Sequence, residues 1–331
     1  MKAMVIEEFG GPEVFHPADV PEPKLKRGHV IIRVAASSVN PIDWKIRSGA
    51  VTGIAPDFPA VLHGDVAGTI EAVGEGVERF EPGDQVYACP GGFADCPGAL
   101  AELMLADADL VAHKPQRLGL EEAAVLPLVS ITAWEALIDR AGVRPGQRVL
   151  VHAGAGGVGH VGVQLAKNAG AITHTTISGK TKAMAARDMG ADVCINYTKT
   201  EVEDYVQEYT DGEGFDVVFD TVGGENMARS FQAVRTGGTV VTIAARGTQD
   251  LTVCHGKGIT LNFVLMLLPL LTGRGRAHHG DILTQLARLV DDGRVKPLLD
   301  PSIYPFRDIG AAHEKLEAGE AIGKIRLRAD F

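Results

Sequence analysis

The sequence predicts an α/β protein that combines a doubly wound parallel sheet with a second, β-rich domain. Three observations lead to this fold class. A glycine-rich turn lies between a buried strand and a helix, strands and helices alternate from about residue 121 onward, and short strands with dense turns precede them. A chain of 331 residues is long enough for about two domains.

The composition limits the partners that the protein can have. Hydrophobic residues make up 45% and charged residues 22%, which is enough apolar material for a sizeable core. The formal net charge is −10, and its charges are spread along the chain rather than gathered in blocks. This distribution argues against nucleic acid and acidic membranes as partners.

Cysteine usage and the apolar runs indicate the compartment. The four cysteines (Cys89, Cys96, Cys194 and Cys254) are too few and too scattered for a disulfide framework. The N-terminus carries charges where a signal peptide needs an apolar run. The longest apolar run, residues 263–271, is far shorter than the roughly 20 residues that cross a bilayer, so we expect it to pack at a pocket or a subunit interface. These features predict a cytoplasmic protein.

Residues 1 to about 120 are expected to form the β-rich domain. Short strands are predicted at 29–35, 68–73 and 85–88, with glycine or proline turns at 74–76 and 82–84. Little of this region has the period of an amphipathic helix.

The glycine turn predicts a dinucleotide site. Residues 149–151 form a short apolar strand, residues 158–168 have a helical apolar period, and Gly154, Gly156 and Gly159 between them have the G-x-G-x-x-G spacing. A strand that turns sharply into a helix presents bare backbone N–H groups at the positive end of the helix dipole, where a pyrophosphate binds. The chain has 40 glycines, so the flanking strand and helix are what make the motif specific. We expect the pyrophosphate at Gly156, Gly157, Val158 and Gly159.

Alternating strands and helices predict the doubly wound sheet around this turn. The strands are expected at 148–152, 171–177, 192–195, 215–219, 239–243 and 259–263, and the helices at 158–168, 180–189, 201–209 and 225–234. Ligands of such sheets lie outside the carboxyl ends of the strands. The residues expected to line the cofactor cleft are therefore Asp220, Thr221, Val222, Gly223, Ala244 and Ala245.

The segment after the second strand indicates which dinucleotide binds. NAD sites carry an acidic residue about 20 residues beyond the glycines, whereas this chain has Ser178, Lys180 and Lys182 there and no carboxylate before Asp188. A hydroxyl and two ammonium groups suit a 2′-phosphate, which a carboxylate would repel, so the sequence favours NADPH over NADH. Alternatively, Ser178 is the N-cap of an ordinary solvated helix. A phosphate-binding P-loop at 178–181 is rejected, because His174 stands where the loop needs its first glycine.

The C-terminal part is expected to complete the first domain. Helices are predicted near 281–292 and 307–318, and a last strand at 323–329. The expected division is therefore 1–122 with 272–331 for one domain and 123–271 for the other.

Several segments together resemble the medium-chain dehydrogenase/reductase superfamily, and within it the quinone oxidoreductase (zeta-crystallin-like) branch. The resemblance covers the whole chain, and its motifs occur in the expected order. It implies that the first domain is a GroES-like catalytic domain and the second a Rossmann domain that binds NADPH. The matching segments are MKAMVIEEFGGPEV (1–14), SSVNPIDWKIRSG (37–49), residues 58–87, LPLVSITAWEAL (126–137), VLVHAGAGGVGHVGVQLAK (149–167) and IGKIRL (322–327).

The resemblance also implies that no catalytic zinc is bound. The three positions that hold this metal in the zinc alcohol dehydrogenases correspond to Asn40, Gly64 and Leu128, which offer neither imidazole nor thiolate. The four-cysteine structural zinc loop of that branch is also missing. A non-standard zinc site built from His63, Asp65 and Cys89 remains open as an alternative, although we expect Asp65 to anchor its strand.

By resemblance, NADPH gives its hydride to a quinone or an α,β-unsaturated carbonyl in a cleft between the domains. Conjugated acceptors spread the incoming charge and so need no metal. Asn40, Asp43 and Thr132 are the residues expected at the reacting centre, although Asp43 could equally be a carboxylate that fixes a turn. The other cofactor contacts that the resemblance implies are Ser178, Lys182 and Tyr197 at the 2′-phosphate, Phe263 and Val264 near the carboxamide, and Gly323 and Lys324 closing the site.

Four points remain open at this stage. Tyr197 could instead be a strand-end aromatic that covers the sheet, and no residue stands out as the proton donor. A homodimer is implied by resemblance, through edge strands near residues 240–263. The alternatives to the reductase are a zinc-dependent alcohol dehydrogenase-like enzyme and a non-catalytic NADPH-binding sensor or structural protein.

Overall fold

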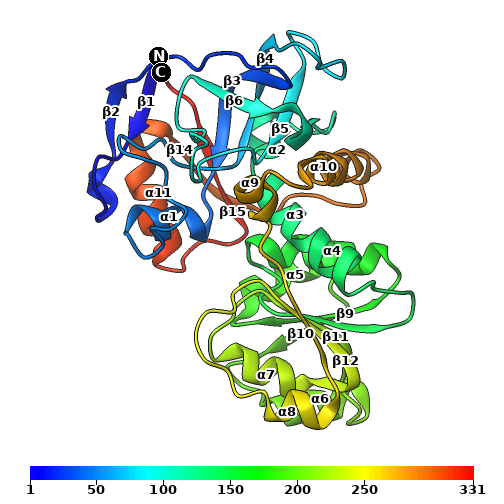
Figure 1. Cartoon of the computed structure of the whole chain (residues 1–331). Coiled ribbons are helices and arrows are strands. Elements are labelled where there is room, and N and C mark those ends of the chain that lie inside the picture. Colours follow the sequence, from blue (N-terminus) through cyan, green and yellow to red (C-terminus); the bar gives the residue numbers. More distant parts are fainter. The chain divides into compact units, whose positions relative to one another are not determined.

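The computed structural model describes all 331 residues and divides the chain into two compact units (Figure 1). The first unit contains Met1–Leu128, Leu267–Gly293 and Leu299–Phe331, and the second contains Val129–Met266 with Arg294–Leu298. These bounds differ by a few residues from the expected 1–122 with 272–331 and 123–271. Residues 294–298 belong to the second unit because Gln164 exchanges hydrogen bonds with the backbone of Lys296.

The second unit is built on a six-stranded parallel sheet, which confirms the doubly wound fold. Its strand order is β10-β9-β8-β11-β12-β13, so the order reverses between β8 and β11. The strands are β8 (Arg148–Val151), β9 (Ile172–Ile177), β10 (Val193–Asn196), β11 (Phe215–Asp220), β12 (Val234–Thr242) and β13 (Thr260–Phe263). The helices are α3 (Pro127–Trp134), a π-helix (Glu135–Arg140), α4 (Gly157–Asn168), α5 (Lys180–Asp188), α6 (Val202–Thr210), α7 (Asn226–Ala233) and α8 (Thr252–Lys257).

Close packing of α4 on this sheet positions the glycine turn. Val149, Leu150 and Val151 of β8 are fully buried. A Cβ added at Gly162 of α4 would lie 3.1 Å from the ring of Phe219 and 3.4 Å from Val151. Glycine at this point therefore lets the helix lie close to the strands whose ends form the site.

The first unit is built on a seven-stranded, mainly antiparallel sheet. Its strands follow the order β14-β15-β3-β4-β5-β7, with β6 also paired to β3, and β1 and β2 form a separate ribbon. The strands are β1 (Lys2–Val5), β2 (His16–Asp19), β3 (His29–Ser38), β4 (Val66–Val73), β5 (Gln85–Ala88), β6 (Leu103–Asp107), β7 (Val111–His113), β14 (Leu299–Pro305) and β15 (Lys324–Arg328). The helices are α1 (Pro41–Arg47), α2 (Leu120–Ala123), α9 (Leu268–Thr272), α10 (Arg276–Asp291) and α11 (Ile309–Glu317), and short 3-10 turns lie at Pro12–Val14, Ala108–Leu110 and Phe306–Asp308. Because β15 pairs antiparallel with β3, the C-terminal strand lies in the sheet of this unit.

The structure contains helices that the sequence patterns did not predict. Helix α1 begins where Asn40 is the N-cap and Pro41 takes the first helical position, a favourable start for even a two-turn helix. Helix α10 begins at Arg276 rather than near residue 281, directly after Gly275 in the left-handed region (φ 80°). None of the helices combines the length and apolar character that crossing a bilayer requires.

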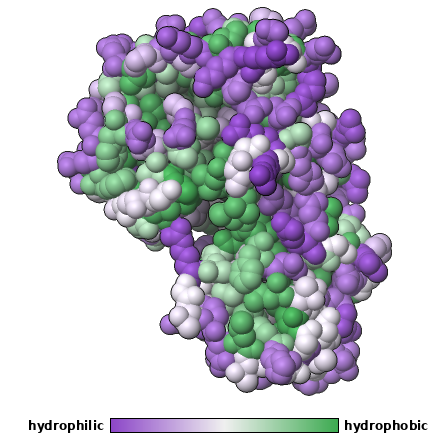
Figure 2. Space-filling model, viewed as in Figure 1, coloured by the Kyte–Doolittle hydropathy of each residue, from purple (hydrophilic) through white to green (hydrophobic).

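The apolar run at residues 263–271 ends β13, passes through a short loop and forms α9. Phe263 and Leu265 keep 56% and 51% of their surface exposed, whereas Val264 between them is buried. On the face shown in Figure 2, apolar side chains gather over part of each unit, and polar side chains cover most of the remainder.

Candidate functional site

The glycine turn between β8 and α4 is shaped to receive a group against its backbone. Ala153 adopts a positive φ of 56°, Gly156 is the N-cap of α4, and the helix begins at Gly157. A Cβ at Gly154 would lie 2.1 Å from Thr175 Oγ1, and one at Gly159 would lie 2.1 Å from the carbonyl oxygen of Ala153. First-turn N–H groups lack acceptors within their helix. This cradle therefore fits the pyrophosphate of a dinucleotide.

Two threonines of β9, which sequence reasoning missed, hold the turn in shape. Thr175 Oγ1 accepts from Gly154 N (2.8 Å) and donates to Val151 O (2.7 Å). Thr176 Oγ1 accepts from Ala153 N (3.1 Å). The signal in the sequence was the pair of β-branched hydroxyl residues near the end of the strand that follows the glycines.

Two loops at the carboxyl ends of β11 and β12 come together. Asp220 Oδ1 accepts from the N–H groups of Val222 and Gly223, both at 2.9 Å. Gly223 has φ 74°, and a Cβ there would lie 2.1 Å from Ala244 O. Thr221 Oγ1 donates to His152 O at 2.7 Å. The structure thus brings the 221–223 loop against residue 244, which Ala245 follows, and ties the loop to the end of β8.

The residues expected at the 2′-phosphate lie at the carboxyl ends of β9 and β10. Tyr197 N donates to Ile177 O (3.2 Å), which places Tyr197 beside the β9 end that Ser178 continues. The N-cap of α5 is Gly179, so the alternative role of Ser178 as N-cap is wrong. Lys182 in the first turn of α5 forms no hydrogen bond or ion pair, and Tyr197 is 49% exposed. An ammonium without a partner in the chain suits a phosphate.

The residues expected near the nicotinamide lie on separate elements of the second unit. Phe263 ends β13, and Val264 N donates to Thr242 O of β12 (3.0 Å). Thr132 lies in α3 and is 4% exposed.

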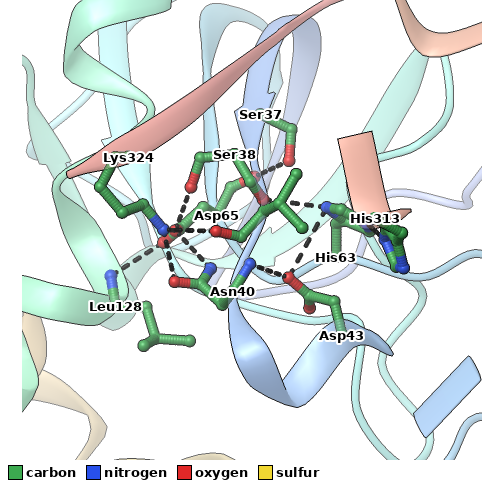
Figure 3. Close-up of polar contacts among 10 residues, drawn as sticks. Ser37, Ser38, Asn40, Asp43, His63, Asp65, Leu128, His313 and Lys324 are labelled. Carbon is green, nitrogen blue, oxygen red and sulfur yellow. Dashed lines mark hydrogen bonds and ion pairs between the residues drawn. The ribbon is translucent and has the colours of Figure 1, made fainter. Parts of the chain in front are cut away.

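In the first unit, Asp65 is the centre of a fully buried polar network (Figure 3). Its carboxylate accepts from Ser38 Oγ (2.6 Å), Asn40 Nδ2 (2.8 Å) and Leu128 N (2.8 Å). Lys324 Nζ lies 3.5 Å from Asp65 Oδ2. Asp65 therefore anchors β4 to β3, as expected, and also joins the start of α3 and β15.

Lys324 locks the orientation of the Asn40 amide. Its ammonium donates to Asn40 Oδ1 and to Val39 O (2.9 Å), while Asn40 Nδ2 is committed to Asp65. Burial lowers the pKa of Lys324, and the Asp65 carboxylate acts in the opposite direction. Gly323, just before β15, adopts φ 69°. Both functional atoms of Asn40 are thus used inside the protein.

Asp43 fixes the start of α1. Its Oδ2 accepts from Asn40 N at 2.7 Å, so Asp43 plays the turn-fixing part considered for it. Asp43 is 1% exposed, and burial raises its pKa to about 8. The His63 ring lies 3.7 Å away, measured from Nδ1 to Asp43 Oδ2.

A buried histidine pair next to this network was missed by sequence reasoning. His63 Nδ1 donates to the Ser38 carbonyl (2.9 Å), so its Nε2 must accept from His313 Nε2 (2.9 Å). Burial lowers the pKa of His63 to about 4 and that of His313 far below its usual value. The two residues are 250 positions apart, and no local pattern connects them.

The three positions that hold zinc in the related metal enzymes come together around Asp65, but they offer no ligand set. Asn40 and Leu128 bind the Asp65 carboxylate, and a Cβ at Gly64 would lie 2.8 Å from Cys89 Sγ. No group of three or more His, Cys, Asp or Glu side chains is placed to hold a metal ion, so His63, Asp65 and Cys89 do not form the alternative site.

Known proteins resemble this chain over its full length. Residues 26–116 match the family "Alcohol dehydrogenase GroES-like domain", and residues 189–327 match "Zinc-binding dehydrogenase". The chain is 33% identical to the NADPH-dependent alkenal/one oxidoreductase of Arabidopsis thaliana chloroplasts, over 98% of this chain and 78% of that protein. It is 30% identical to the quinone oxidoreductase of Homo sapiens, over 99% and 97%.

Solved structures agree with these matches. An alcohol dehydrogenase superfamily protein from Novosphingobium aromaticivorans is 39% identical, with a TM-score of 0.95 and 100% of both chains covered. The Escherichia coli quinone oxidoreductase complexed with NADPH is 27% identical, with a TM-score of 0.87, covering 99% of this chain and 100% of that one.

Proposed function

Because this chain belongs to the medium-chain dehydrogenase/reductase superfamily, in its quinone oxidoreductase branch, we propose that it reduces quinones and α,β-unsaturated carbonyls with NADPH and without zinc. It is an NADPH-dependent oxidoreductase. Conjugated acceptors are the substrate class that suits it, since they disperse the charge of an incoming hydride over several atoms.

The side chains around Asp65 carry this proposal. Asn40, Gly64 and Leu128 stand where the zinc enzymes need ligands, and the cation that lies with them is the Lys324 ammonium. The Asn40 amide donates to Asp65 and accepts from Lys324, and Gly64 has no space for a larger side chain. These residues cannot supply the thiolate and imidazole that zinc prefers.

The second unit supplies the groups that would bind NADPH, which provides the hydride when bound. The N–H groups of Gly157, Val158 and Gly159 would hold the pyrophosphate, because they open α4 without partners inside the helix. Lys182 would neutralise the 2′-phosphate, with Ser178 and Tyr197 beside it. The remaining contacts proposed in this unit are Gly154, Gly156, Thr221, Val222, Ala244, Ala245, Phe263 and Val264.

The residues proposed at the reacting centre act through shape and fixed dipoles rather than by proton transfer. Asn40 is held in one orientation by Lys324, which follows Gly323, and Asp43 holds the start of α1. Thr132 is the corresponding residue of α3. Such rigid, nearly dry surfaces favour reaction by orienting the reactants and excluding water.

The proposal extends to assembly and location. A homodimer through β13 is supported by its place at the edge of the sheet and by the exposed Phe263 and Leu265. Sedimentation of the purified protein tests this directly.

A cytoplasmic location is supported by four cysteines that are all free thiols.

Loss of the reduced-nicotinamide absorbance tests the function. Protein treated with a chelator is given NADPH or NADH with simple quinones, enones, alkenals and saturated aldehydes. Turnover with NADPH on the conjugated acceptors alone is expected. Activity that appears only after zinc is added would contradict the metal-free proposal, and tight NADPH binding without any turnover would identify a sensor or scaffold instead.

A further inference from the structure

His152 and Asp220 each bury a polar atom that nothing else in the chain satisfies. Their side chains are 2% and 0% exposed, and the unpaired atoms are His152 Nε2 and Asp220 Oδ2. Buried polar groups in proteins are almost always paired with another residue or with an ordered water. Two such atoms just beyond a pair of hydrogen-bonded strands therefore need an explanation.

These residues lie at the point where the strand order of the parallel sheet reverses. His152 directly follows β8 and Asp220 ends β11, and β8 pairs with β11 through Val151 and Phe219. His152 N continues this ladder by donating to Phe219 O at 2.9 Å. Doubly wound sheets bind their ligands beyond the strand ends at this reversal.

Hydrogen bonds fix the tautomer of His152. Thr176 Oγ1 has two hydrogen-bond partners, Ala153 N and His152 Nδ1, each at 3.1 Å. Because the backbone N–H can only donate, Nδ1 is the acceptor for the buried hydroxyl proton. An Nδ1 that accepts leaves the proton of the neutral ring on Nε2. Burial lowers the pKa of His152 to about 4, in keeping with a neutral ring. His152 Nε2 is therefore a buried donor.

Asp220 offers the matching acceptor. Its Oδ1 accepts from Val222 N, Gly223 N and Asn226 Nδ2, at 2.9, 2.9 and 3.0 Å. These three donors hold the loop after β11, while Oδ2 has no donor. The charge of Asp220 acts on His152 by favouring its protonated form, so the two groups interact through space.

We propose that one trapped water molecule accepts from His152 Nε2 and donates to Asp220 Oδ2, and that His152 is thereby a positioning residue for NADPH. Through this water, the glycine turn, held by Thr176, is coupled to the loop at 221–223, held by Asp220. A bridging water is nearly as favourable as a direct hydrogen bond. The inference rests on the proposed binding of NADPH at the glycine turn.

Direct measurement of NADPH affinity tests the coupling. His152→Leu removes the donor at similar volume and should raise the dissociation constant about tenfold, the loss of one good hydrogen bond. His152→Gln, which keeps an N–H donor, should restore most of the affinity. His174→Leu is the matched control, because His174 is also buried in this sheet with an unpaired nitrogen but lies inside β9. It should lower stability and leave the dissociation constant unchanged.

The proposal would be overturned if His152→Leu bound NADPH with unchanged affinity, if His174→Leu lost as much affinity, or if glutamine at position 152 restored none.

Nitrogen NMR of the unmodified protein tests the proposal without a variant. We expect a neutral ring protonated on Nε2, with a slowly exchanging proton, whereas an Nδ1–H tautomer would refute the water bridge. The tautomer is read without cofactor or turnover, so its result is independent of whether the proposed function fails.

Discussion

Removing the negative charge of Asp65 should destabilise the first unit strongly. Asp65→Asn keeps the shape of the side chain but replaces one acceptor by an amide donor. That donor faces Leu128 N at the Oδ1 position, or Asn40 Nδ2 and Lys324 Nζ at the Oδ2 position. The Lys324 ammonium then remains buried, at 3% exposure, without the carboxylate that forms its ion pair. Breaking a buried ion pair at one end costs about 3–5 kcal/mol, and leaving a buried donor unpaired costs about 1–3 kcal/mol. Because these costs overlap, we expect a loss of about 4 kcal/mol in the free energy of unfolding.

The assay is urea unfolding followed by the fluorescence of Trp44, which lies on α1 in the first unit. The other tryptophan, Trp134, lies in the second unit, so a Trp134→Phe background lets the signal report on the first unit alone. Asp19→Asn is the matched control. The Asp19 side chain lies 2.8 Å from Lys2 Nζ, closer than Asp65 lies to Lys324, but the two side chains are 72% and 58% exposed. Because solvent screens this exposed pair, the urea midpoint of Asp19→Asn should equal that of the parent.

A second substitution separates the charge from the packing. Adding Lys324→Met to Asp65→Asn removes the uncompensated ammonium and keeps most of the side-chain volume. The double variant should therefore recover part of the stability that the single variant loses, about 1–3 kcal/mol. The buried-charge reasoning is wrong if the free energy of unfolding of Asp65→Asn lies within about 1 kcal/mol of that of the parent. It is also wrong if the double variant loses as much stability as the two single variants together.

Three further predictions follow from the same geometry. Lys182→Ala should weaken NADPH binding by about 1–3 kcal/mol and barely change NADH binding, as measured by titration; equal weakening of both would remove Lys182 from the 2′-phosphate site. Gly159→Ala places a Cβ 2.1 Å from the carbonyl oxygen of Ala153 and should abolish cofactor binding. The control Gly256→Ala, whose Cβ would have no other atom within 4 Å, should bind the cofactor normally. Normal binding by both variants would show that the glycine turn does not hold the pyrophosphate. The pKa of His63 is about 4 in the folded protein, below its unfolded value of 6.5. Between these pH values the unfolded chain binds a proton that the folded chain does not. The free energy of unfolding therefore decreases as the pH falls from about 6.5 to about 4. In urea titrations, His63→Gln should reduce this acid-dependent loss of unfolding free energy by about 3 kcal/mol. An unchanged loss would assign the acid sensitivity to other groups.

Much of the second unit could be predicted from the sequence because its signals are local. The apolar strand 149–151, the glycine spacing and the helical period that follows lie within about one strand–helix unit. The observed β8 and α4 bounds differ from the expected ones by a single residue. The π-helix after α3 was not predicted, because LPLVSITAWEAL is apolar all round and has no amphipathic period to read.

The polar network of the first unit could not be predicted, because its members meet only through the tertiary fold. Lys324 reaches Asn40 across 284 positions and His313 reaches His63 across 250. The resemblance pointed to Asn40 and Lys324 as separate site residues, but not to the hydrogen bond that fixes one through the other. The sequence contains the residues of such a network, and only β15 lying against β3 brings them together.

The charge arrangement around Asp65 explains why a conjugated acceptor suits this chain. A zinc ion lowers the barrier by drawing electron density from a carbonyl oxygen. The cation at the corresponding place is the Lys324 ammonium, and it is already paired with Asp65 and bonded to the Val39 carbonyl and the Asn40 amide. An ammonium paired in this way polarises a substrate only weakly, because its N–H groups and its counter-charge are already engaged within the protein. The substrate must then accommodate the hydride's charge itself, which quinones and enones do by conjugation and isolated ketones do not.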